Sequence, residues 1–161
     1  MVIPPELPDQ LMEEALIEAR LAAAGGEVPV GAVVWHGGGI LARGHNQVEK
    51  DQSVVSHAEI LALQRASAAL GSWRLEDCVL CVTLEPCVMC LGAIRLARIP
   101  VVIFGAGDSR QGAAGSLFDL TLDERIGTPT RVVRGIKSEA CEKLLSSFFS
   151  TLRNRQTIPS S

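Results

Sequence analysis

The chain lacks several features that would place it in a common class. No apolar run among its 161 residues approaches the ~20 that a membrane-spanning helix needs. Residues 1–6 turn acidic at Glu6 and lack the positive region of a secretory signal. The five cysteines are an odd number, and disulfides would not persist in a reducing compartment. We therefore expect a cytoplasmic protein without membrane association.

Internal repeats, interdomain linkers and low-complexity blocks are also absent, apart from a short polar tail at 157–161. A chain of 161 residues can bury one substantial core but is too short for two ordinary domains. Its 47% hydrophobic and 20% charged residues are typical of a globular protein, because disorder needs the reverse balance. We expect a single domain over residues 1–156, followed by the tail.

The net charge of −3 is unfavourable for binding nucleic acid, but the charges are unevenly distributed. Residues 1–27 carry six acids and one arginine, whereas residues 125–161 carry seven Lys or Arg and two Glu. Such asymmetry between the ends of a chain indicates a surface for a polyanion. A solvated helix face would explain the same pattern, and charge alone favours that simpler explanation.

Hydrophobic periodicity predicts an alternation of helices and strands. We expect Pro86 in the first turn of its helix and Ser138 as the N-cap of the last helix. The expected helices cover 9–24, 57–70, 86–97 and 138–154, the expected strands cover 28–35, 40–45, 78–83, 101–104 and 130–134, and a polar loop covers 46–56. This order predicts one central sheet with helices on both faces.

Two short segments, His57-Ala58-Glu59 and Pro86 to Cys90, contain the residues with the clearest chemistry. One imidazole and two thiols are zinc ligands, and three protein ligands leave the fourth position open to water, as in a catalytic site. Both segments fall at expected helix N-termini, where the helix dipole favours thiolates. Cys87 and Cys90, three residues apart, share one helix face. Glu59 is placed to carry protons for the water.

Each of these residues also has a simpler explanation. Cys-x-x-Cys alone fits a redox pair, half of a four-cysteine zinc knuckle, or coincidence. The knuckle needs a second pair, which is absent, and a redox role leaves His57 and Glu59 unexplained. Gly105 to Gly107 is not a phosphate loop, because no Gly-Lys-Ser/Thr follows. The remaining cysteines lie among apolar residues and are expected in the core: Cys78, Cys81 and Cys141.

The pattern His-x-Glu followed by Pro-Cys-x-x-Cys is typical of zinc-dependent nucleobase deaminases. From Val28 to Phe149 the chain resembles the bacterial tRNA-specific adenosine deaminases of the cytidine-deaminase-like superfamily. The zinc motif identifies only the superfamily. The Gly-Ala-Ala-Gly-Ser loop and the Phe-Phe pair resemble those of its tRNA-specific branch. The matching segments are VPVGAV at 28–33, GHN at 44–46, HAEI at 57–60, VTLEPCVMC at 82–90, FGA at 104–106, GAAGS at 112–116 and FF at 148–149.

This resemblance implies an α/β fold, a three-layer α/β/α sandwich with a five-stranded mixed sheet. It implies a homodimer with active sites near the subunit interface. It further implies hydrolytic deamination of adenosine to inosine at the wobble position of a tRNA anticodon, mainly in the arginine tRNA, with one Zn²⁺ per subunit. By residue match, zinc would be held by His57, Cys87 and Cys90, and Glu59 would be catalytic.

The same match implies residues that bind the substrate. Asn46 would hydrogen-bond the flipped nucleotide, the Ala58 N–H would hold the base, and Asp108 would contact a neighbouring ribose. Asn and Asp also favour turns, so both have an ordinary explanation as loop residues. On the last helix, Phe148 lies inside an apolar stripe and is expected in the core. Phe149 lies at the edge of that stripe, where it could stack on an unpaired base of an RNA loop.

Two alternatives stay open at this stage. The first is a deaminase of free guanine or cytosine on the same scaffold, because the zinc motif does not select the substrate. The second is a non-catalytic, zinc-containing subunit that only binds RNA. Glu59 argues against the second, since a pure scaffold has no use for a carboxylate beside the metal. We expect a tRNA anticodon loop as the partner and expect no DNA binding.

Overall fold

The structure is a computed structural model, and it describes residues 1–157. The helices are α1 (Leu7–Ala24), α2 (Val48–Asp51), α3 (Ala58–Leu70), α4 (Val88–Leu96) and α5 (Ser138–Gln156), with a 3-10 turn η1 (Glu124–Ile126). The strands are β1 (Gly31–His36), β2 (Gly39–His45), β3 (Val79–Leu84), β4 (Val101–Ala106) and β5 (Arg131–Arg134). Part of the tail expected at 157–161 lies outside the described residues.

The five strands form one sheet in the order β2-β1-β3-β4-β5. β1 is antiparallel to β2 and to β3, whereas β3, β4 and β5 are parallel. The mixed five-stranded sheet predicted from the resemblance is therefore confirmed. Because parallel strands end at the same edge, the segments that follow β3 and β4 emerge side by side.

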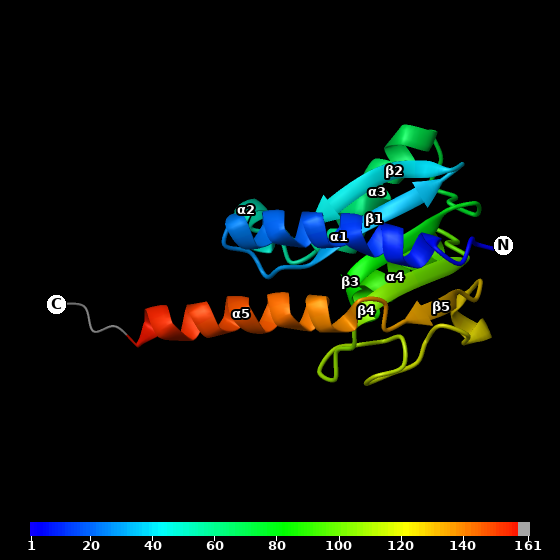
Figure 1. Cartoon of the computed structure of the whole chain (residues 1–161). Helices are drawn as coiled ribbons and strands as arrows, with labels where there is room; N and C mark the ends of the chain where they lie inside the picture. Colours follow the sequence, from blue (N-terminus) through cyan, green and yellow to red (C-terminus); the bar gives the residue numbers. More distant parts are fainter. Residues whose placement is uncertain (158–161) are drawn as a thin grey trace.

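Helices cover both faces of this sheet (Figure 1). Strand side chains alternate between faces, so neighbouring residues of β3 join different cores. Leu80 packs in a core with α3 and α4, whereas Cys81 packs in a second core with α1 and the start of α5. The three-layer α/β/α arrangement is thus confirmed. The three cysteines assigned to the core are buried: Cys78, Cys81 and Cys141.

Two glycines allow helices to contact the sheet closely. A Cβ at Gly31 would lie 2.1 Å from the Ala15 carbonyl oxygen of α1. A Cβ at Gly44 would lie 2.6 Å from the Ala58 carbonyl oxygen in the first turn of α3. No side chain fits at either separation, so glycine is needed at both positions. Gly44 thereby brings the end of β2 against the start of α3.

The structure corrects three local expectations. Pro86 precedes Cys87, the N-cap of α4, and is therefore not in the first turn. Ser138 is the first residue of α5 rather than its cap, because Lys137 takes the flanking position with a φ of 50°. The loop 46–56 contains the short helix α2, whose first amides are hydrogen-bonded by a carboxylate from outside the loop, as described below.

The apolar stripe of α5 is less buried than expected. Cys141 is the one fully buried residue of this helix, and Phe148 is partly exposed. The physical reason is visible in Figure 1, where α5 runs well beyond the sheet and leaves its second half without a covering layer. Among the described residues 1–157, no helix is both long and apolar enough to span a membrane.

Candidate metal centre and active site

The candidate metal ligands lie at the N-termini of two helices on the same face of the sheet. His57 is the N-cap of α3 and Cys87 is the N-cap of α4, both with extended backbone. Cys90 lies in the first turn of α4. Unpaired amides at a helix start make its surroundings positive, which favours thiolates. The structure therefore brings together the three residues that the sequence selected.

The spacing of the three ligand atoms fits a tetrahedral zinc ion. The Nδ1 atom of His57 lies 3.8 Å from Cys87 Sγ and 3.4 Å from Cys90 Sγ. All three ligand atoms lie within 4.8 Å of one another. Zn–S bonds of about 2.3 Å and Zn–N bonds of about 2.0 Å at a tetrahedral angle would separate N and S by about 3.5 Å. The donor set and its geometry thus suit zinc.

The protonation of the two thiols also suits a site for a cation. A hydrogen bond from the Cys90 thiol, assisted by His57, lowers the pKa of Cys87 to about 4. The same hydrogen bond, together with burial, raises the pKa of Cys90. The cluster by itself therefore holds one thiolate readily and resists a second. A divalent cation between the sulfurs would remove that resistance.

Glu59 is the second residue of α3 and is almost fully buried, with 4% of its surface exposed. Burial disfavours its charged form and raises the pKa of Glu59 to about 7, although His57 opposes the shift. The Cys90 thiol and His57 are both close enough to act on the pKa of this carboxyl, so Glu59 lies beside the ligand atoms. A carboxyl with a pKa near neutrality can both accept and donate a proton at physiological pH.

The two residues expected to hold the base also lie at this end of the sheet. Asn46 follows β2, and the next amide, that of Gln47, donates to the carbonyl oxygen of Ser56 just before His57. The Asn46 side chain donates to the Val28 carbonyl oxygen and accepts the Val48 amide, both at a long distance of 3.4 Å. Its amide is therefore weakly engaged within the protein.

Ala58 is buried and is the first residue of α3. An N–H at this position has no acceptor within its own helix, so it is available to a ligand. The requirement for glycine at Gly44 keeps the end of β2 against this turn. The Asn46 segment and the Ala58 amide therefore belong to one rigid corner of the protein.

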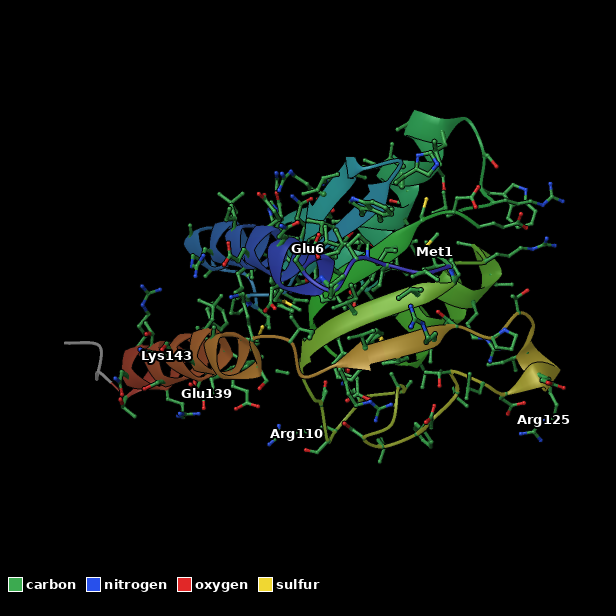
Figure 2. All side chains as sticks on the ribbon, turned by 45° about the vertical axis from the view of Figure 1, so that its right-hand side comes forward. Met1, Glu6, Arg110, Arg125, Glu139 and Lys143 are labelled. Carbon is green, nitrogen blue, oxygen red and sulfur yellow. The ribbon has the colours of Figure 1, made fainter. Side chains whose placement is uncertain are left out.

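Asp108 lies in the loop that follows β4 and is partly exposed. Its side chain accepts hydrogen bonds from the amides of Arg110 at 2.9 Å and Gln111 at 3.2 Å, which form a tight turn. Arg110 projects from this loop into solvent (Figure 2). The backbone of Asp108 is held by Glu85, a residue that sequence reasoning did not single out.

Glu85 and Glu27 are buried carboxylates that the sequence analysis missed. Burial raises the pKa of Glu85, but hydrogen bonds from Ser116, Asp108 and Ala114 outweigh it and lower that pKa. Glu27 accepts the amides of Glu49 at 3.0 Å and Lys50 at 2.9 Å, which explains why α2 forms. The sequence signal for each was its position: Glu85 directly follows a buried strand, and Glu27 directly follows the Gly-Gly pair that ends the first helix.

Phe149 is the one candidate that the structure does not bring to the metal cluster. It lies on α5, which packs with α1 on the opposite face of the sheet from α3 and α4. Its ring is 41% exposed and meets Phe148 edge to face, with centroids 5.5 Å apart. The exposed half of α5 leaves the ring free to meet a large ligand that extends past the sheet.

Two hollows adjoin the ligand helices. One of about 290 Å³ borders the ligand Cys87 and the 107–116 loop, and it is lined by Cys87, Val88, Met89, Arg110, Gln111, Leu117 and Phe118. A larger groove of about 770 Å³ runs over α3, α4 and η1. Exposed apolar side chains line this groove, including Trp73, Leu96 and Ile126.

A family model described as MafB19-like deaminase matches residues 8–153 of the chain. A tRNA-specific adenosine deaminase from Bacillus subtilis is 47% identical over 145 residues, which cover 90% of each protein. A solved structure from a study of A-to-I editing by tRNA:A34 deaminases at the wobble position of transfer RNA matches with a TM-score of 0.82. It is 38% identical and covers 84% of this chain and 99% of its own.

A guanine deaminase from Bacillus subtilis also has a similar structure. Its TM-score is 0.61 at 31% identity, covering 98% of this chain and 99% of its own. This likeness is weaker in shape and identity than that to the tRNA:A34 deaminase.

Proposed function

The chain belongs to the family of tRNA-specific adenosine deaminases, and on this premise we propose that residues 1–156 form a zinc-dependent enzyme that converts adenosine to inosine in tRNA. The proposed target is the wobble position of the anticodon, and the arginine tRNA is the first substrate to test. The observation that carries the proposal is the His57, Cys87 and Cys90 cluster beside a buried carboxyl at Glu59.

Zinc would be held by His57, Cys87 and Cys90, and when bound it makes a coordinated water more acidic and thus a better nucleophile at neutral pH. Glu59 takes one proton from the attacking water and passes it to the ring nitrogen, and then takes the second proton from the newly added hydroxyl and passes it to the departing amine. Its burial supports this role, because a pKa of about 7 makes both directions of transfer feasible. Water is consumed, ammonia leaves, and a carbonyl replaces the amine.

Substrate binding uses the corner between β2 and α3. The loosely held Asn46 amide turns to hydrogen-bond the flipped nucleotide, and the Ala58 N–H holds the base. Asp108, in the loop after β4, contacts the ribose of a neighbouring nucleotide. Phe149, exposed on the projecting half of α5, stacks on another base of the anticodon loop.

Incubation with an anticodon stem-loop RNA and with free guanine and cytosine tests the reaction. We expect inosine in the RNA, detected by mass spectrometry of digested nucleosides, and no turnover of free bases. Turnover of free guanine without inosine in RNA would overturn the proposal in favour of the free-base alternative.

Glu59→Gln tests whether the protein is an enzyme or only binds zinc and RNA. It should keep zinc and RNA binding but lower kcat by about 100- to 10,000-fold, the usual contribution of a general acid–base group. The matched control is Glu14→Gln, which neutralises a partly exposed carboxylate on α1 and should leave kcat unchanged. An unchanged rate in Glu59→Gln would contradict the proposed role.

A homodimer is part of the same proposal. The groove over α3 and α4 exposes Trp73 at 55% and Leu96 at 73% of their surfaces, an apolar face that a second copy would cover. Because the same helices begin with metal ligands, this partner would lie next to the active site. Sedimentation should give a dimer, and Leu96→Glu should give a monomer. A monomeric parent protein would refute this arrangement.

The tRNA substrate supports a cytoplasmic location.

A further inference from the structure

Glu85 occupies the junction between the metal centre and the loop that carries Asp108. It follows β3 directly and precedes Pro86 and Cys87, the N-cap of α4. Only 2% of its surface is exposed. A buried carboxylate is costly unless it is hydrogen-bonded. The groups that hydrogen-bond Glu85 therefore indicate its structural role.

The partners of Glu85 all come from the loop after β4. One carboxylate oxygen accepts the amides of Ala114 at 2.9 Å and Ser116 at 3.0 Å. The other accepts the amide of Asp108 at 2.9 Å and the Ser116 hydroxyl. Four donors separated by more than twenty residues from Glu85 therefore converge on one side chain. Hydrogen bonds to a charged acceptor are about twice as strong as neutral ones.

The backbone of the loop is shaped to fit this carboxylate. A Cβ at Gly112 would lie 2.4 Å from the Glu85 carboxylate and 2.4 Å from the Asp108 carbonyl oxygen, so only glycine allows the contact. Gly112 also pairs with Cys87 in an isolated β-bridge, and the Ala113 amide donates to the Pro86 carbonyl oxygen at 2.9 Å. The loop is thus joined to the ligand turn on both sides of the carboxylate.

We infer that Glu85 is a positioning residue, which holds the 107–116 loop against the metal-ligand turn so that Asp108 meets the RNA beside the reacting base. The inference rests on the proposed function, because it assigns Asp108 to substrate binding. Glu85 itself touches neither the substrate nor the ligand sulfurs in this arrangement. It acts through the loop, and its loss affects where the RNA binds rather than how the amine leaves.

Hydrogen exchange tests the structural part of the inference without any substrate. Glu85→Gln keeps the size of the side chain but presents an amide NH₂ to donors that need an acceptor. Exchange at Asp108, Ala114 and Ser116 should accelerate by about tenfold or more, because opening of the loop no longer breaks charge-assisted bonds. Amides of β4 should be unchanged. Equal exchange in the loop of both proteins would overturn the inference.

Steady-state kinetics on the anticodon stem-loop test the functional part. Glu85→Gln should raise KM by about tenfold, leave kcat within about threefold, and leave the zinc content of the purified protein unchanged, since a loop displacement of an ångström is enough for such losses. In an Asp108→Ala background the same change should raise KM by less than twofold, because the two residues act through one contact. Additive effects, or a lower kcat at unchanged KM, would overturn the positioning role.

Two further variants keep the test decisive. Ser116→Ala removes one of the four donors while the charge of Glu85 stays, and it should produce the same KM increase on a smaller scale, even if Glu85→Gln does not fold. Glu14→Gln is the matched control, with an equal change of charge on α1, and should alter neither loop exchange nor KM. If the parent protein makes no inosine in RNA, the proposed function fails, whereas the exchange measurement still decides whether Glu85 holds the loop.

Discussion

Arg95 of α4 binds the backbone of residues 120–128, and removing its guanidinium tests how much stability this contact contributes. Its surface is only 2% exposed, although it carries a permanent charge. The guanidinium donates to three backbone carbonyl oxygens, those of Thr128 at 2.9 Å, Leu120 at 2.5 Å and Gly127 at 2.5 Å. The segment 120–128, whose last three residues line the large groove, is therefore folded around one side chain.

Arg95→Met keeps most of the apolar stem and removes all three donors. Each buried carbonyl left without a donor costs about 1–3 kcal/mol, and the loss is partly offset because no charge is buried any longer. We therefore expect the free energy of unfolding to fall by about 3–5 kcal/mol. For a chain of this size that corresponds to a decrease in Tm of about 10 °C.

Urea unfolding followed by circular dichroism measures this loss, at one fixed protein concentration so that association does not enter the comparison. Arg43→Met is the matched control. It also removes a guanidinium, but that group is 41% exposed and pairs with Glu14 at the surface, so its loss should cost less than about 1 kcal/mol. A loss of less than about 1 kcal/mol for Arg95→Met would refute the reasoning.

Three further predictions concern the buried carboxyls and the thiols. In metal-free protein the raised pKa of Glu59, about 7, means that the folded state keeps a proton that the unfolded state releases, so stability falls as pH rises from about 4.5 to 7. Glu59→Gln should therefore stabilise metal-free protein at pH 8 by about 2–3 kcal/mol and much less at pH 4, measured by urea unfolding. Glu27→Gln should accelerate exchange of the α2 amides by about tenfold while α3 stays protected, as exchange mass spectrometry would show. After chelation, iodoacetamide at pH 6 should label Cys87, whose pKa is about 4, and spare buried Cys78, whose pKa is raised to about 11, a difference that peptide mapping would detect.

The metal cluster was predictable because its determinants are local. His57 and Cys87 each begin a helix, and helix starts can be recognised from the residues on either side. The short spacing of Cys87 and Cys90 then keeps both sulfurs at the same helix start, one on the N-cap and one in the first turn. Only the approach of the two helix starts needed the sheet, which the order of elements predicted and the resemblance specified as five-stranded and mixed.

The expectation for α5 was wrong because burial is not a local property. The spacing of apolar residues predicted a buried stripe through Phe148, and the helix has that stripe. Burial also needs a neighbouring layer, and the sheet ends before the second half of α5 (Figure 1). The pattern therefore describes which side of a helix is apolar, and the length of the sheet decides how much of that side is covered.

The sequence by itself determined the donor atoms for a metal, the acid beside them and the order of helices and strands. Only the tertiary structure decided how the loops around the site are held. Three buried side chains, those of Glu27, Glu85 and Arg95, hydrogen-bond backbone groups that lie 22 to 33 residues away along the chain. Examples are the Glu49 amide, bound by Glu27, and the Thr128 carbonyl oxygen, bound by Arg95. Every residue except proline carries the same amide, so such a partner leaves no mark on residue type. The metal ligands and the acid are side chains that the sequence shows directly, whereas the positions of the loops depend on backbone groups that only folding brings into reach.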